Sequence, residues 1–167
     1  MDIARAMGMA KSSLYHYFPE KRALLMAVLE EGMDPLLDGA SEIQLASLEP
    51  SEELRALLRR HAIQCEEKLT HLLVYLREYR TLDSPTEALA GYVMKRRRYD
   101  DAFVATVKRG QAAGLFIQGD ARVIVYGLLG MYNWMVQWYR PGHGMEVGEI
   151  AAVFEDMALR AITAGAS

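Results

Sequence analysis

Apolar residues recur at spacings of three and four along nearly the whole of this 167-residue chain. That spacing is the period of an amphipathic helix, whereas a half-buried strand requires apolar and polar residues to alternate. β-Branched residues are sparse and nowhere alternate with polar ones over a useful length. The sequence therefore predicts an all-α fold, with enough residues for one ordinary domain or for a small domain joined to a medium one.

Charge and cysteine content narrow the class of protein further. The net charge of −3 predicts that any contact with nucleic acid depends on a local basic patch. Cys65 is the only cysteine, which excludes an internal disulfide and suits a reducing compartment. No apolar run approaches the ~20 residues of a membrane span, and the N-terminus lacks the pattern of a secretory signal. We therefore expect a cytoplasmic protein without membrane contact.

Turn-forming and capping residues divide the chain into a series of expected helices. These helices span residues 2–7, 11–17, 19 onward, 51 to about 69, 71–82, 86 to about 113, 121–139 and 147–163. Gly8 marks a tight turn between the first two, and Pro19 opens the third where its missing N–H does no harm. Gly32 and Pro35 predict a break or kink within that third helix. The expected N-caps are Ser51 and Asp120.

The first 31 residues have the proportions of a helix-turn-helix with its supporting helix behind it. The apolar residues among them are spaced so that they can share one small core. Residues 2–21, DIARAMGMAKSSLYHYFPEK, closely resemble the signature of the TetR family of transcriptional repressors. The resemblance implies a DNA-binding domain over residues 1–31 and a helical ligand-binding and dimerisation domain over residues 32–167.

The resemblance also identifies candidate contacts to a palindromic operator. Exposed N–H groups and short polar side chains at the start of a recognition helix reach phosphates and base edges. By resemblance, the residues further along face the DNA backbone, and His16 is in a position to face a base. The candidate DNA-binding residues are Lys11, Ser12, Ser13, Tyr15, His16, Tyr17 and Lys21. The alternative is that the tyrosines only pack against neighbouring helices.

One departure from the family pattern leaves two hypotheses open. Family members carry a further helix before the position of Ile3, which completes the DNA-binding unit, and it is missing here. The protein is either a repressor whose given sequence starts late, or a helical ligand-binding and dimerising protein without DNA binding. We favour a late start, because the rest of the motif is intact and the absent helix would cover one side of its apolar cluster.

The segment over residues 121–144 is the most unusual part of the body. Asn133 and Gln137 lie four apart on one face of an otherwise apolar helix, and a buried amide needs a partner on a neighbouring helix or a ligand. Gly127 and Gly130 permit close helix approach. Because the last two helices of the family form its dimer interface, we expect a homodimer built from residues 121–139 and 147–163.

Part of this segment is similar to a subset of TetR-type regulators that sense acyl-coenzyme A thioesters. The similarity rests on Asn-Trp at residues 133–134 and Trp-Tyr-Arg-Pro-Gly at residues 138–142. The cationic run over residues 95–98 wraps most of the way around its helix, so at least one member should point inward. That cation can pair with coenzyme A phosphates. The alternative is a solvated run with Asp100 and Asp101 as counter-charges.

The candidate effector site collects residues from three helices that the family fold brings together. They are Leu72, Tyr75, Tyr79, Tyr92, Arg96, Tyr99, Asn133 and Gln137. The leading candidate effector is a long-chain or aromatic acyl-coenzyme A, and no cofactor is expected.

Two further residues are spaced as candidate metal ligands. His61 and Cys65 are four apart, a spacing available to two metal ligands, but no third ligand accompanies them, so we favour a buried thiol beside a hydrogen-bonded imidazole. The sequence contains no nucleophile with an adjacent base, no glycine-rich phosphate loop and no paired carboxylates in an apolar setting. It does not predict an enzyme.

Overall fold

The computed structural model describes residue 16, residues 21–67 and residues 87–165 of the chain. This described part contains five helices and no strand, which confirms the all-α prediction; a single bridge pairs Phe116 with Thr163. The helices are α3 (Lys21–Leu45), α4 (Pro50–Glu67), α6 (Glu87–Ala112), α7 (Ala121–Trp138) and α8 (Val147–Ile162). None of these helices is sufficiently long and apolar to span a membrane.

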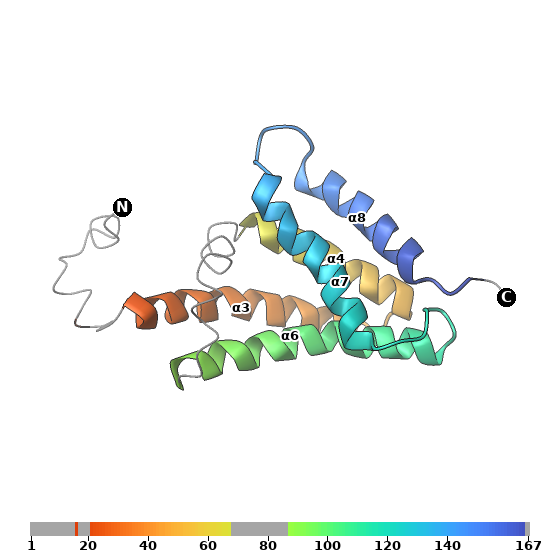
Figure 1. The fold of residues 1–167 in the computed structure, drawn as a ribbon, viewed down its shortest axis with the longest axis horizontal. Helices are drawn as coiled ribbons and strands as arrows, with labels where there is room; N and C mark the ends of the chain where they lie inside the picture. The colour runs from red at the N-terminus through yellow and green to blue at the C-terminus, as the bar shows by residue number, and fades with distance from the viewer. Residues whose placement is uncertain (1–15, 17–20, 68–86, 166–167) are drawn as a thin grey trace.

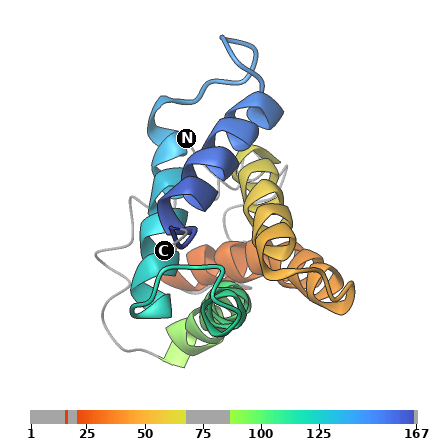
Figure 2. The same cartoon turned by 90° about the vertical axis from the view of Figure 1, so that its right-hand side faces the viewer.

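The five helices form two groups that meet along α4. Helices α3 and α6 run side by side, and the N-terminal end of α3 points away from α7 and α8 (Figure 1). Turning the molecule shows α4, α7 and α8 gathered on one side of that pair (Figure 2). Helix α4 packs against α3, α6, α7 and α8, so it is the element shared by both groups.

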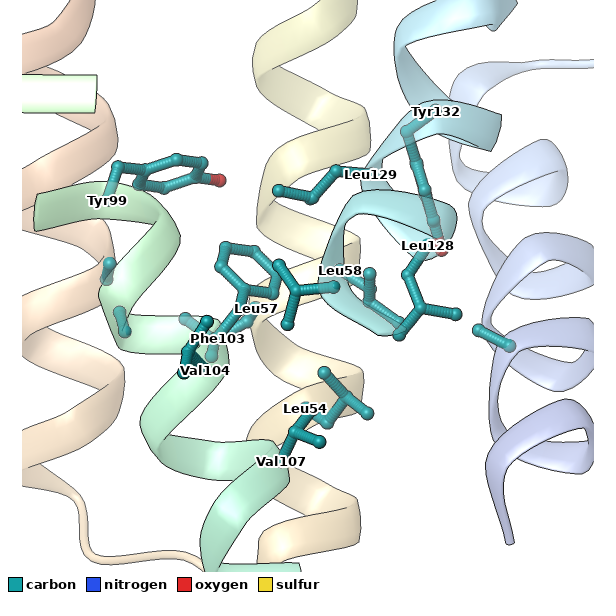
Figure 3. Close-up of a cluster of buried hydrophobic side chains, with 14 of the residues drawn as sticks. Leu54, Leu57, Leu58, Tyr99, Phe103, Val104, Val107, Leu128, Leu129 and Tyr132 are labelled. Atoms are coloured by element: carbon teal, nitrogen blue, oxygen red, sulfur yellow. The ribbon is translucent and has the colours of Figure 1, made fainter. Parts of the chain in front are cut away.

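An apolar stripe on α4 explains why this helix is central. Leu54, Leu57, Leu58 and Ala62 recur at helical spacing, and all four are fully buried. Figure 3 shows the side chains that meet the three leucines from α6 and α7. They include Phe103, Val104, Val107, Leu128, Leu129 and Tyr132. Burying each large apolar side chain contributes about 1.5–3 kcal/mol, so this cluster is a major source of stability.

The helix boundaries test the expected caps and turns. Asp120 caps α7 as predicted, because its Oδ1 accepts from the backbone N–H of Arg122 at 2.8 Å and of Val123 at 3.1 Å. The prediction of Ser51 as an N-cap is wrong. Helix α4 already begins at Pro50, which suits the first helical position because that N–H has no intrahelical acceptor. Ser51 therefore lies within the first turn.

A break at Gly32 and Pro35, one of the two expected outcomes, does not occur. Helix α3 continues through Pro35 to Leu45. An internal proline removes one hydrogen bond and costs about 3 kcal/mol. On both sides of Pro35, α3 buries apolar side chains such as Met33 and Ala40 in the main core, and this packing offsets the cost. The helices expected over residues 2–7 and 71–82 lie outside the described residues, and of the one over residues 11–17 only His16, which is helical, is described.

Two fully buried carboxylates fasten α4 to its neighbours. Glu53 accepts from the Thr106 hydroxyl at 2.5 Å and from Arg109 Nη1 at 3.0 Å, which ties α4 to α6. Glu155 of α8 accepts two hydrogen bonds from Arg59 of α4, both at 2.8 Å. A buried carboxylate is tolerated only when charge and hydrogen bonds compensate for lost hydration, so each arginine is needed where it lies.

Removing the Arg109 guanidinium should therefore destabilise the protein. We expect Arg109→Ala to lower the free energy of unfolding by about 1–3 kcal/mol. The Glu53 carboxylate would remain buried with only the Thr106 hydroxyl as a donor, and water entering the half-exposed space left by Arg109 would restore only part of the lost hydrogen bonding. The neighbouring exposed Lys108→Ala should change it by less than about 0.5 kcal/mol. Denaturant unfolding measures both, and equal effects would show that the ion pair adds nothing.

Candidate functional site

A cluster of polar side chains lies in the apolar interior where α4, α6 and α7 meet. His61 of α4 is buried, and its Nδ1 lies 3.0 Å from the hydroxyl of Tyr99 on α6. Figure 3 shows the Tyr99 hydroxyl directed from α6 toward α4. The imidazole is also enclosed by the rings of Phe103 and Tyr132, with ring centroids 6.4 and 5.8 Å away and near-perpendicular planes. The cluster therefore joins three helices around one imidazole.

The side chains of this cluster are neutral. Burial and the nearby Arg96 cation together lower the pKa of His61 to about 4, and a hydrogen-bonding contribution from the Asn133 side chain opposes this shift. No hydrogen bond of normal geometry reaches His61 Nε2 from the described residues. Burial raises the pKa of the Cys65 thiol to about 12 and that of Tyr99 well above its usual value. A neutral imidazole, thiol and phenol suit hydrogen bonding rather than nucleophilic chemistry.

Several buried polar atoms of this region lack a partner among the described residues. They are His61 Nε2, Gln64 Oε1, Tyr132 Oη and Arg60 Nε. An unmet buried donor or acceptor costs about 1–3 kcal/mol, so a native protein retains one only for a reason such as a missing ligand or water. Of these, His61 and Tyr132 belong to the cluster, whereas the Arg60 side chain lies against Gly39 of α3.

The four cationic side chains at residues 95–98 lie in three different surroundings. Lys95 turns to α3, where its Nζ lies 2.6 Å from Asp34 Oδ1. Arg96 has a quarter of its side chain exposed and binds the buried Asp100 at 3.1 Å, and its charge acts on His61, Cys65 and Tyr99. The last two arginines are exposed. One expected counter-charge, Asp101, instead pairs with Arg122 of α7 at 2.6 Å.

The structure gathers part of the predicted effector site. Tyr92 and Tyr99 are buried, Arg96 is partly buried and Asn133 is half-buried beside His61. Gln137, four residues after Asn133, is exposed, so the structure does not bring these two amides together. Three predicted members lie outside the described residues, namely Leu72, Tyr75 and Tyr79.

Only two positions of the predicted DNA-binding set are described. His16 is exposed, and Lys21 is the first residue of α3. The others lie outside the described residues, namely Lys11, Ser12, Ser13, Tyr15 and Tyr17.

The sequence predicts His61 and Cys65 on one helix face but gives no link between them and the predicted effector site. The prediction of a buried thiol and a hydrogen-bonded imidazole is confirmed by the contact with Tyr99. Tyr132 was missed. One signal was available: His61 continues the three-and-four spacing of Leu54, Leu57 and Leu58, which places its ring on the buried stripe.

A second notable surface is the outer face of α7 and α8. Its exposed apolar side chains are Val123, Tyr126, Trp134, Trp138, Val153 and Met157. Gly127 and Gly130 lie between those of α7, and a Cβ at either would meet no described atom within 4 Å. Trp138 and Val153 also line a groove of about 280 Å³ at the end of α7. No helix of the described chain approaches these glycines, so the predicted close approach does not occur within one copy.

Comparison with known proteins places the chain in a family. A family model described as the C-terminal domain of tetracyclin repressor-like proteins matches residues 47–162. The chain belongs to the TetR family. A second model, for bacterial regulatory proteins of this family, matches residues 1–28.

Proteins similar to this chain include a transcriptional repressor and a regulator solved with a coenzyme A thioester and operator DNA. The HTH-type transcriptional repressor KstR2 of Mycolicibacterium smegmatis is 26% identical over 164 residues, which are 97% of this chain and 79% of that protein. The TetR-type regulator PfmR of Thermus thermophilus has a TM-score of 0.82 at 28% identity, with 95% of this chain and 86% of that chain covered. AibR bound to isovaleryl coenzyme A and operator DNA has a TM-score of 0.81 at 27% identity, with 93% and 84% covered.

The low pKa of His61 predicts a defined pH dependence of stability. In the unfolded chain the imidazole binds a proton near pH 6.5, whereas the folded protein accepts one only near pH 4. Between these values the unfolded state holds more protons, so stability falls as the pH drops from 6.5 toward 4. His61→Gln should remove on the order of 2 kcal/mol of the difference in unfolding free energy between pH 7 and pH 5.

Denaturant unfolding at the two pH values measures this effect. His143→Gln, at an exposed position after α7, is the matched control and should retain the wild-type pH dependence. If His61→Gln and the wild type lost equal stability on acidification, the imidazole would not be held neutral by burial.

Proposed function

We propose that this protein is a ligand-controlled transcriptional repressor that binds palindromic operator DNA as a homodimer and releases it when an acyl-coenzyme A enters the body of each subunit. Two relatives support the proposal. One is named a transcriptional repressor, and the other, AibR, is described in complex with isovaleryl coenzyme A and operator DNA. The match of a DNA-binding family model at residues 1–28 favours this proposal over a ligand-binding protein that does not bind DNA.

The observation that carries the proposal is the neutral polar cluster buried between α4, α6 and α7. An effector with an apolar body and a few polar atoms matches an apolar interior in which His61 Nε2 and Tyr132 Oη lack partners among the described residues. Arg96 adds a partly exposed cation at the same place. A cation at the edge of such a site suits the phosphates of coenzyme A, which stay close to solvent.

DNA contact is assigned to residues 1–31, with the seven candidate residues named from the sequence. Helix α3 would belong to both domains, since it begins at Lys21 and packs against α6 and α4 over its later turns. The Lys95–Asp34 ion pair ties it to α6 one residue before Arg96. An effector that moves this part of α6 would therefore move α3, provided that it binds the two arrangements with affinities that differ by a few kcal/mol.

Dimerisation is assigned to the outer face of α7 and α8. On α7 the exposed residues Val123, Tyr126, Gly130 and Trp134 follow helical spacing, so they form one continuous stripe. Large exposed apolar stripes are unusual on a monomer and typical of an interface between subunits. The glycines within the stripe leave space for close approach by the partner helix.

The effector assignment is tested by titration with acyl-coenzyme A thioesters of several chain lengths. Sequences that the protein binds are first selected from a random duplex pool, and we expect a palindrome with half-sites one or more helical turns apart. Thioesters should raise the thermal unfolding temperature and release this DNA, whereas free coenzyme A should do neither. Arg96→Ala should weaken thioester binding about tenfold, and the exposed Arg98→Ala should leave it unchanged.

Two outcomes would contradict the proposal in different ways. If no DNA sequence were enriched, the protein would not be a DNA-binding repressor. If DNA bound but no thioester stabilised the protein or released DNA, the acyl-coenzyme A assignment would be wrong.

The dimer assignment is tested by placing a charge on the α7 stripe. Gly130→Glu should convert a dimer into a monomer, because a buried carboxylate without a partner opposes association. The monomer itself should fold, since a Cβ at residue 130 meets no described atom within 4 Å and glycine is a poor helix former. Sedimentation at micromolar concentration distinguishes the two states, with Arg97→Glu on exposed α6 surface as the control that remains dimeric. A monomeric wild type would refute the interface.

A further inference from the structure

We propose that His61 recognises the effector by donating a hydrogen bond from Nε2 to its carbonyl oxygen, and that Tyr99 is a positioning residue that keeps the proton on that nitrogen. This inference rests on the proposed function, because it requires an effector that carries a carbonyl group. The first support is geometric. His61 is enclosed by α4, α6 and α7, and its Nδ1 is bound to Tyr99 at 3.0 Å. The Asn133 amide lies near the imidazole and raises its pKa, but no described residue makes a hydrogen bond of normal geometry to Nε2.

The Tyr99 contact selects one of the two neutral forms of the imidazole. If Tyr99 donates its O–H to Nδ1, the ring proton resides on Nε2, and one donor is left without a partner. If Nδ1–H donates instead, the Tyr99 proton and the Nε2 lone pair are both left unmet. Each unmet buried group costs about 1–3 kcal/mol, so the first arrangement is favoured within the described cluster. Nε2 is then a donor.

The surroundings of this donor favour a neutral acceptor. A carboxylate at this depth would need a cation of its own. Arg59, on the same helix as His61, is held by Glu155, and the Arg60 side chain lies against Gly39 of α3. Arg96, which binds Asp100 at 3.1 Å, is the cation already assigned to the coenzyme A phosphates. A thioester, ester or ketone carbonyl needs only hydrogen bonds. The Tyr132 ring, whose centroid lies 5.8 Å from that of the imidazole, adds an apolar face beside this donor.

Nearby side chains also restrict where the carbonyl can lie. The imidazole is flanked by Tyr99 and Phe103, whose rings contact each other at 5.2 Å, and by Tyr132, whose ring meets Phe154 at the same distance. These rings are apolar except for their hydroxyls, so the acyl chain can pack against them while its carbonyl faces His61. His61 would thus recognise the thioester carbonyl, which joins the acyl chain to coenzyme A, and not the acyl chain or the coenzyme A moiety itself.

The test compares decanoyl-coenzyme A with S-decyl-coenzyme A, a thioether that has no carbonyl. By calorimetry the wild type should bind the thioester about tenfold more tightly than the thioether. His61→Phe, which keeps a ring but removes the donor, should bind the two equally. His61→Gln, whose amide N–H is a donor of similar reach, should restore part of the preference. His143→Phe, the same substitution at an exposed histidine after α7, is the control and should keep the full preference.

The role of Tyr99 is tested by nitrogen NMR of the imidazole. In the ligand-free wild type, the shifts should report the Nε2–H form, and Tyr99→Phe should give a mixture of both forms and a reduced thioester preference. If the role of Tyr99 were purely structural, Tyr99→Phe would weaken the binding of the thioester and the thioether equally. An Nδ1–H form in the wild type, or equal binding of the two compounds, would overturn the inference alone. Failure of the wild type to bind either compound would overturn the proposed effector and the inference with it.

Discussion

Burial of helix α4 is the constraint on which the rest of the described structure depends. Its leucine stripe meets α6 and α7 in the main core, and its remaining sides contact α3 and α8. Apolar burial is not directional, so the stripe alone would tolerate rotation or sliding of the helices. The buried carboxylates remove that freedom: Glu53 accepts from two α6 side chains, and Glu155 accepts two parallel bonds from Arg59. Specific geometry thus comes from ion pairs and stability from the apolar contacts.

The same stripe creates the candidate site. His61 and Cys65 occupy positions at which the helix period requires apolar residues, and burial keeps both uncharged. A buried polar group lowers the stability of the folded protein unless it is hydrogen-bonded. The Tyr99 hydroxyl bonds only Nδ1 of the His61 imidazole. A site of this kind discriminates by hydrogen-bond complementarity, because an effector lacking the matching acceptor would leave the buried donor unmet.

Two adjacent residues connect this interior to helix α3. Successive residues on a helix point about 100° apart, so Lys95 and Arg96 of α6 reach different neighbours. Lys95 pairs with Asp34 of α3, while the charge of Arg96 acts on the buried cluster. A shift of this turn of α6 would act both on α3 and on the buried cluster. This arrangement is the physical basis of the proposed link between effector binding and the position of α3.

Much of the fold was determined by the sequence alone. The three-and-four spacing predicted an all-α chain, Asp120 predicted the start of α7, and residues 2–21 indicated the TetR family. These features depend on neighbours within one or two turns, where local geometry dominates. Only the tertiary structure decided that α3 continues through Pro35, because packing against other helices offsets the lost hydrogen bond. It alone joined His61 to Tyr99, which lie 38 residues apart, and left Gln137 exposed although Asn133 is half-buried. Such outcomes depend on how helices dock, and docking is governed by contacts between residues distant in the chain.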